Sequence, residues 1–96
     1  MPQVSVVATL VAKKGCDQEL EKLLKGLVGH SRKDEGCIQY DLHRGIEEPR
    51  VYVFYEIWES MELLQKHSKA PHLEALQRDG AALIESRDIK VLEKIA

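Results

Sequence analysis

Apolar residues alternate along residues 3–12 and predict a β-strand there. One face of this strand carries Val4, Val6, Ala8, Leu10 and Ala12. The opposite face carries Val7, Thr9 and Val11, so it is apolar as well. A strand of an antiparallel sheet usually turns one polar face to water. We therefore expect this strand to be buried on both sides.

A helical repeat of apolar residues follows the first strand. Its members recur every three or four positions, with charged residues between them: Leu20, Leu23, Leu24, Leu27 and Val28. Asp17 is a residue type that caps helix starts, and Gly36 suits the left-handed position that closes a helix. The sequence therefore predicts a helix between these two residues.

Two further strands are predicted at residues 37–44 and 51–58. The segment between them, residues 45–49, begins with glycine and ends with proline, so it is compatible with a hairpin turn. Along the second of these strands, apolar and aromatic residues occupy both faces. This strand, like the first, is expected to be covered on both sides.

The last third of the chain predicts two helices and a strand. Ser60 is a good N-cap for a short helix that runs through His67, and Pro71 can open the next helix. The apolar stripe of that second helix is formed by Leu73, Leu76, Ala81, Leu83 and Ile84. Residues 88–95 then alternate as a final strand.

The element order β-α-β-β-α-β is that of a ferredoxin-like α+β domain, which residues 1–96 fill as a single unit. Helices that lie on one side of a four-stranded antiparallel sheet can cover only one of its faces. The two-sided strands therefore need a second cover, and the chain has no spare element to supply it. We expect a homodimer in which the two sheets pack face to face.

Composition narrows the classes of partner. The chain has 14 Lys and Arg, 16 Asp and Glu, and a net charge of −2, with no basic stripe that would neutralise phosphates. Nucleic-acid binding is therefore not expected. No apolar run approaches the roughly 20 residues that span a bilayer, and the N-terminus lacks a signal peptide's basic region. We expect a cytoplasmic protein without a membrane partner, in which Cys16 and Cys37 are free thiols.

Glu56 and Trp58 are two positions apart in the third strand and so point to the same face. A carboxylate on a mostly aromatic face is costly to bury unless it has a partner or a polar cavity. One interpretation is a pocket wall in which the indole packs an aromatic substrate and the carboxylate orients it. The alternative is a sheet-edge glutamate paired with Arg or Lys, with Trp58 as core.

His67 and His72 lie on either side of Pro71 and lack the one-turn spacing of a helical metal motif. A zinc site would need a third ligand, and none is evident nearby in the sequence, so we expect no metal. An unperturbed histidine titrates near neutrality, so a small shift of the pKa of His67 would suit proton abstraction from a phenolic hydroxyl. The alternative is a helix-end histidine bonded to backbone carbonyls. Tyr40 is expected to be buried, but periodicity does not show whether it shares the face of Glu56.

Three segments together resemble the antibiotic biosynthesis monooxygenase (ABM) family: Glu35-Gly-Cys-Ile-Gln-Tyr-Asp-Leu-His43, Val51-Tyr-Val-Phe-Tyr-Glu-Ile-Trp58 and Gln65-Lys-His-Ser-Lys-Ala-Pro-His72. The resemblance implies a dimeric α+β barrel, and some members are quinol monooxygenases that use no cofactor. It implies a small aromatic substrate, O₂ as co-substrate, and no bound cofactor. The implied catalytic residues are His67 and Glu56, and the implied substrate contacts are Trp58, Tyr40, His72 and Phe54.

Other functions are known on the same fold. One relative is an isomerase that acts on a phosphorylated signalling-molecule derivative, which would call for a basic phosphate site. Haem-degrading relatives carry a pocket asparagine and a haem-ligating histidine, where this chain has Ala8 and Gln77. A dimeric small-molecule-binding domain without turnover is the non-enzymatic alternative. The chain has no Gly-rich phosphate loop and no Ser-His-Asp arrangement.

Overall fold

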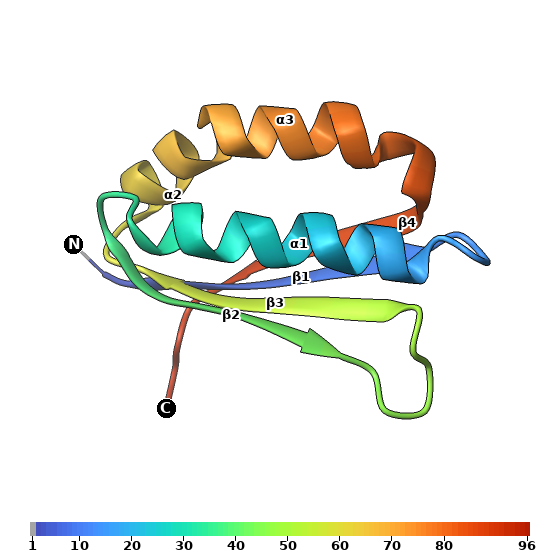
Figure 1. Cartoon of the computed structure of the whole chain (residues 1–96). Helices are drawn as coiled ribbons and strands as arrows, with labels where there is room; N and C mark the ends of the chain where they lie inside the picture. The colour runs from blue at the N-terminus through green and yellow to red at the C-terminus, as the bar shows by residue number, and fades with distance from the viewer. Residues whose placement is uncertain (1) are drawn as a thin grey trace.

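The computed structural model describes residues 2–96 as a four-stranded antiparallel sheet with its helices on one side (Figure 1). The elements follow one another as β1 (Val4–Ala12), α1 (Asp17–Arg32), β2 (Cys37–Arg44), β3 (Val51–Trp58), α2 (Met61–Ser68), α3 (Pro71–Gly80), a 3₁₀ turn (Ala81–Leu83) and β4 (Ile84–Leu92). The strand order in the sheet is β2-β3-β1-β4. The predicted ferredoxin-like fold is confirmed.

The ends of α1 differ from the prediction. Asp17 is the first residue of the helix, and Cys16 occupies the N-cap without a side-chain hydrogen bond. The helix ends at Arg32, so Gly36 lies beyond its C-cap, in the turn before β2. Gly36 has a φ of +83°, and the Leu63 side chain fills the space that a Cβ would need there. Glycine is therefore required by this turn and by the close approach of α2, rather than by the helix end.

The second helical region follows the prediction at its start and departs from it at its end. Ser60 caps α2, with its Oγ accepting a hydrogen bond from the Leu63 N–H at 3.3 Å, and Pro71 opens α3. However, α3 ends at Gly80, and β4 begins four residues before the predicted position, at Ile84. Pairing of Ile84 with Ala12 of β1 continues the sheet and overrides the local helical spacing.

One sheet face and the helices form the core. The buried residues of this core are Val4, Val6, Ala8, Leu10, Ala12, Leu20, Leu24, Leu27, Tyr40, Tyr52, Phe54, Trp58 and Leu83. The other face keeps Tyr55 36% exposed. Figure 1 shows that the β2–β3 hairpin and the C-terminal end both project on this uncovered side. Ile46 in the hairpin and Ile95 near the C-terminus are 99% and 90% exposed.

Among residues 2–96, no helix is long and apolar enough to cross a membrane.

Candidate functional site

Tyr40 and Glu56 lie on the same face of the sheet. They are direct cross-strand partners between β2 and β3, and opposite residues of antiparallel strands point to one side. That side faces the helices, where Tyr40 is 2% exposed and Glu56 is 5% exposed. The question that periodicity left open is thus settled: the tyrosine, the glutamate and Trp58 share the helix-covered face.

Glu56 is a buried carboxyl with a single hydrogen-bond donor among the described side chains. Trp58 Nε1–H donates to its Oε1 at 2.9 Å, and Trp58 is fully buried. Since β3 lies between β1 and β2, the alternative of a sheet-edge glutamate paired with a basic residue is wrong. Burial raises the pKa of Glu56 to about 7, and the Trp58 hydrogen bond partly opposes this rise. Near neutral pH the group is therefore ready either to take up or to give a proton.

His67 sits near the end of α2 with its side chain only 4% exposed. Its Nδ1 lies 2.7 Å from Oδ2 of Asp34, so its partner is a carboxylate rather than a backbone carbonyl. Its ring packs against Trp58 at 4.3 Å between centroids, tilted by 33°, and meets Tyr40 edge-on at 5.5 Å. Burial lowers the pKa of His67, while Asp34 acts in the opposite direction. A carboxylate that accepts from Nδ1–H leaves Nε2 as the basic nitrogen.

Asp34, which sequence reasoning missed, joins both histidines. Its Oδ2 lies 2.9 Å from His72 Nε2 as well as 2.7 Å from His67 Nδ1. The histidines are 33 and 38 positions away in sequence, so no local spacing could reveal the contact. The only available signal was that Asp34 immediately precedes the Glu35-Gly36-Cys37 segment of the family resemblance.

These three residues also form a donor set of the kind that metals use, with their ligand atoms all within 4.8 Å of one another. Tetrahedral zinc with bonds of about 2.0–2.1 Å would hold neighbouring ligand atoms about 3.3 Å apart. The observed 2.7 and 2.9 Å are hydrogen-bond distances to one shared oxygen. We therefore interpret the cluster as two imidazole N–H groups that donate to one carboxylate. The expectation of a metal-free site stays a prediction.

A cavity of about 140 Å³ lies between the helix-covered sheet face and the helices. Its wall is mostly apolar, and Tyr40, Glu56 and His67 supply buried polar groups. The predicted substrate contact Phe54 also lines it. Trp58 does not line the cavity, because it lies behind His67 and beside Glu56. The structure thus gives Trp58 a supporting position instead of a face that could pack a substrate.

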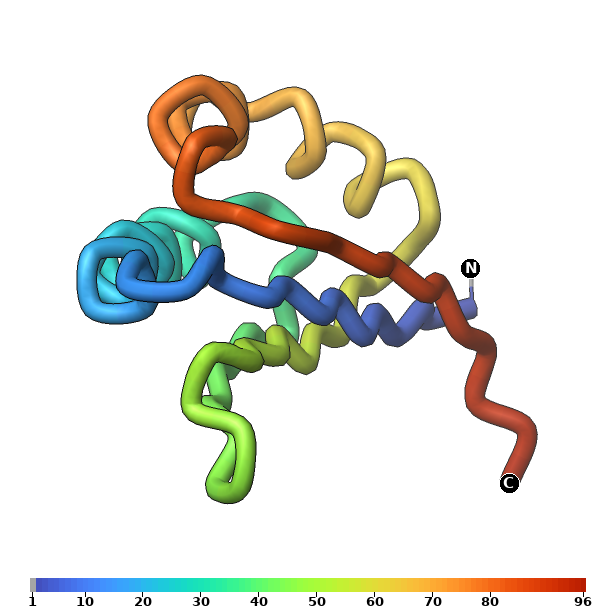
Figure 2. The backbone as a smooth tube through the Cα atoms, turned by 90° about the vertical axis from the view of Figure 1, so that its right-hand side faces the viewer, coloured from blue at the N-terminus to red at the C-terminus, as the bar shows by residue number. Residues whose placement is uncertain are grey.

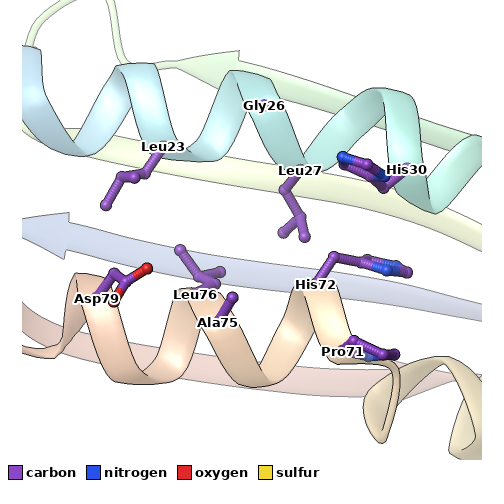
Figure 3. Close-up of a pocket in the computed structure, with 9 residues that line it drawn as sticks. All are labelled: Leu23, Gly26, Leu27, His30, Pro71, His72, Ala75, Leu76 and Asp79. Carbon is purple, nitrogen blue, oxygen red and sulfur yellow. The ribbon is translucent and has the colours of Figure 1, made fainter.

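The remaining predicted contact, His72, lines a surface groove between α1 and α3 (Figure 3). This groove measures about 510 Å³, and His30 stacks on His72 across it at 5.5 Å between ring centroids. Leu27 and Leu76 line both the groove and the cavity and so stand between them. The groove is larger, but Tyr40, Glu56 and His67 line the cavity and not the groove. We place the candidate site in the cavity for this reason.

The cysteines add no chemistry to the site. Cys16 and Cys37 are free, as predicted. Burial raises the pKa of the Cys37 thiol, and the nearby carboxylates of Glu56 and Asp34 raise it further. Because the thiolate is the nucleophilic form, a thiol that holds its proton this firmly is a poor nucleophile.

Residues 3–79 match the model of the family described as "Antibiotic biosynthesis monooxygenase". The chain belongs to the ABM family. The predicted family resemblance is therefore confirmed.

Individual relatives agree with the ABM assignment. A Bacillus subtilis protein named "Putative monooxygenase YcnE" is 32% identical over 62% of this chain. The chain spans 63% and 60% of the lengths of the two curated relatives it matches. The crystal structure of PA3566 from Pseudomonas aeruginosa has a TM-score of 0.95 at 30% identity, covering 100% of this chain and 97% of that one. Protein SO0527 from Shewanella oneidensis follows with a TM-score of 0.94 at 26% identity, covering 99% and 94%.

Within this ABM domain, two cavity residues bear on haem chemistry. Ala8 and Gln77, which stand where haem-degrading relatives are expected to carry asparagine and histidine, both line the cavity. Neither an alanine nor a glutamine supplies the imidazole that would ligate haem iron.

The Trp58 hydrogen bond should hold down the pKa of Glu56 in this ABM domain. In a Trp58→Phe variant the carboxylate stays buried but loses its donor, so its pKa should rise above about 7. Titration of the Glu56 side-chain carbon signal by NMR measures this directly. An unchanged or lowered pKa in the variant would show that water or another donor replaces the indole.

Proposed function

We propose that this protein is a cofactor-independent monooxygenase that oxidises a quinol or phenol with O₂ inside the cavity. The observation that carries this proposal is the position of His67 in the cavity wall, in contact with Asp34. Its Nδ1 contacts Asp34 at 2.7 Å, and its ring forms part of the wall of a mostly apolar cavity. A buried base beside an apolar cavity can deprotonate a phenol that is shielded from water.

In the proposed reaction, Nε2 of His67 takes the proton of a substrate hydroxyl. The resulting imidazolium is stabilised by Asp34, which the Nδ1 contact places 2.7 Å away. Burial raises the pKa of Tyr40, as does the charge of Glu56, so its hydroxyl keeps its proton and can donate to the new oxyanion. The His67–Asp34 pair thus supplies the base, and Tyr40 stabilises the negative charge of the substrate anion.

The electron-rich anion then passes an electron to O₂, and the radical pair combines at a ring carbon. Loss of water gives a hydroxyquinone, so one quinol and one O₂ yield one hydroxyquinone and one H₂O. O₂ accepts four electrons: two come from oxidation of the quinol to the quinone level, and two come from conversion of a ring C–H bond to C–OH. The substrate itself provides the electrons, so the balance requires neither metal nor flavin.

Glu56 is proposed to bind the second hydroxyl of the quinol. It lines the cavity and lies directly across the strand pair from Tyr40. With a pKa of about 7 it accepts a hydrogen bond as a carboxylate or donates one as an acid. The two hydroxyls of a quinol would thus meet two different proton-exchanging residues, His67 and Glu56.

The size of the cavity limits the substrate. Its volume of about 140 Å³ is close to that of an engineered apolar cavity of about 150 Å³ that binds benzene. One aromatic ring therefore fits inside. A polycyclic phenol would have to extend through the open side of the cavity. We propose a single-ring quinol as the preferred substrate, and oxygen uptake by protein free of metal and flavin tests the proposal.

We also propose that the protein is a homodimer built through the uncovered sheet face. Support comes from the half-exposed apolar face of β1 and β3 and from Leu92 of β4, which pairs with Ser5 on that face and is 43% exposed. A second copy would bury these side chains, and the projecting hairpin and C-terminus would reach across it.

Sedimentation at micromolar concentration should therefore give about twice the 10.9 kDa mass of the chain. Replacing the far-face residue Ile57 with Glu should shift the protein toward monomer, because it buries a charge at the proposed contact. A wild-type protein that sediments as a monomer at these concentrations would rule out the sheet-to-sheet dimer.

A further inference from the structure

The cavity opens to the surface between α2, α3 and β4. The exposed residues of its lining are Ser68, Gln77, Arg87 and Ile89. Arg87 pairs with Leu10 and Ile89 pairs with Ala8 across β1 and β4, so all four point to the helix side of the sheet. Figure 2 shows β4 running along β1 as the neighbouring outer strand. Arg87 thus lies on the open side of the cavity, opposite α3.

Arg87 differs from the other arginines of the chain in its lack of an acidic partner. Ion pairs join four of the five arginines to carboxylates: Arg32 to Asp41, Arg44 to Glu21, Arg50 to Glu85 and Arg78 to Asp79. Within residues 2–96, Arg87 has no carboxylate at ion-pair distance, and the adjacent Asp88 pairs with Lys90 at 2.9 Å. The guanidinium at the cavity mouth is therefore free for a ligand.

We propose that the cavity recognises phenols and quinols that carry a carboxylate, and that Arg87 binds this carboxylate at the mouth. The inference rests on the proposed function, because it places the ring hydroxyl among Tyr40, Glu56 and His67 inside. A guanidinium matches a carboxylate with two parallel hydrogen bonds, which would fix the ring's orientation. The net charge of −2 offers no overall attraction for an anion, so this recognition is local.

The small number of cationic side chains at the cavity favours a carboxylate ligand over a phosphate. Apart from His67, which acts as the base, Arg87 is the one side chain in the lining of the cavity that can carry a positive charge. Phosphate groups carry up to two charges and three acceptor oxygens, and they are usually held by several donors. A single guanidinium satisfies a monoanionic carboxylate better. This reasoning also disfavours the isomerase of a phosphorylated substrate as the function of this cavity.

A matched pair of ligands tests the inference without any turnover. Calorimetry on the wild-type protein should show that 4-hydroxybenzoate binds about 3- to 10-fold more tightly than 4-hydroxybenzamide, which has the same shape and no charge. Arg87→Gln should remove this preference, and Arg87→Lys should retain part of it. Arg78→Gln is the control, because it removes the same charge from an exposed residue outside the cavity lining. High salt should narrow the wild-type difference.

The outcomes separate the two proposals. Equal binding of acid and amide by the wild-type protein would overturn the role of Arg87 and leave the phenol site standing. So would a preference that survives in Arg87→Gln. If neither ligand binds, and neutral hydroquinone does not bind either, the cavity is not a phenol site and both proposals fall.

Discussion

A His67→Asn variant should turn over an accepted quinol about 10²–10⁴-fold more slowly than the wild-type protein, which is the usual contribution of a positioned acid–base group. Asparagine can still donate to Asp34 from the position of Nδ1, but it has no counterpart of Nε2. It is preferable to alanine because His67 is buried and packed against Trp58, so a truncation would also leave a cavity. The loss should fall mainly on kcat.

The pH dependence identifies the base. Since burial lowers the pKa of His67, the wild-type rate should rise with pH through an apparent pKa below 6.5 and then level off. The residues that face His67 and titrate or carry charge are Asp34, His72, Tyr40 and Glu56. In His67→Asn this rising limb should vanish. The matched control is His43→Asn, because His43 is exposed on β2 and away from the cavity. Undiminished turnover with the limb intact would assign the base to Glu56 or to the substrate's own ionisation.

Glu56→Gln should change the pH dependence of stability. The folded-state pKa of Glu56 is raised from 4.5 to about 7, so between these values the native state binds more protons than the unfolded state. Stability of the wild-type protein should therefore fall as pH rises through this range, by about 2–3 kcal/mol in total, and level off above it. Glutamine has no charge to bury and can still accept from Trp58 Nε1–H. The variant should lose this slope and be the more stable protein at pH 8.

Urea unfolding at pH 5 and pH 8 measures this effect. The control is Glu47→Gln, because Glu47 lies in the exposed hairpin and should leave the wild-type slope in place. Equal slopes in wild-type and Glu56→Gln would mean that Glu56 is solvated or paired in solution, and would remove it from the proposed site. Coupling to dimer formation is controlled by keeping the protein concentration fixed.

The fold was predictable because the apolar residues of each element repeat at the spacing of that element, every second residue in the strands and every third or fourth in the helices. Alternation along β1 and β3 and the helical repeat of α1 gave the element order, and the two-sided strands indicated an uncovered sheet face. The end of α3 was not predictable in the same way. Leu83 and Ile84 continue the helical spacing of the sequence, but Ile84 pairs with Ala12 and β4 begins there. Long-range strand pairing decided this boundary.

The site was predictable only in part. The period of a strand placed Glu56 and Trp58 on one face, and the structure shows that Tyr40 shares this face. Asp34, which contacts both His67 and His72, lies in the turn between α1 and β2. It reaches the two histidines only because this turn packs against α2 and α3. That packing also put Trp58 behind His67 and His72 in the groove. Such placements arise from tertiary contacts, which residue spacing does not encode.

The central claim is best tested by oxygen uptake. Purified protein, treated with chelator and shown by its absorption spectrum to lack flavin and haem, is mixed with single-ring quinols in an oxygen electrode cell. We expect O₂ consumption above the autoxidation rate, proportional to protein concentration, with one O₂ used per quinol and hydroxyquinone as product. His67→Asn should reduce this increment by about 10²–10⁴-fold. An increment that appears only after metal or flavin is added, or no increment with any quinol that binds the cavity, would contradict a cofactor-independent monooxygenase.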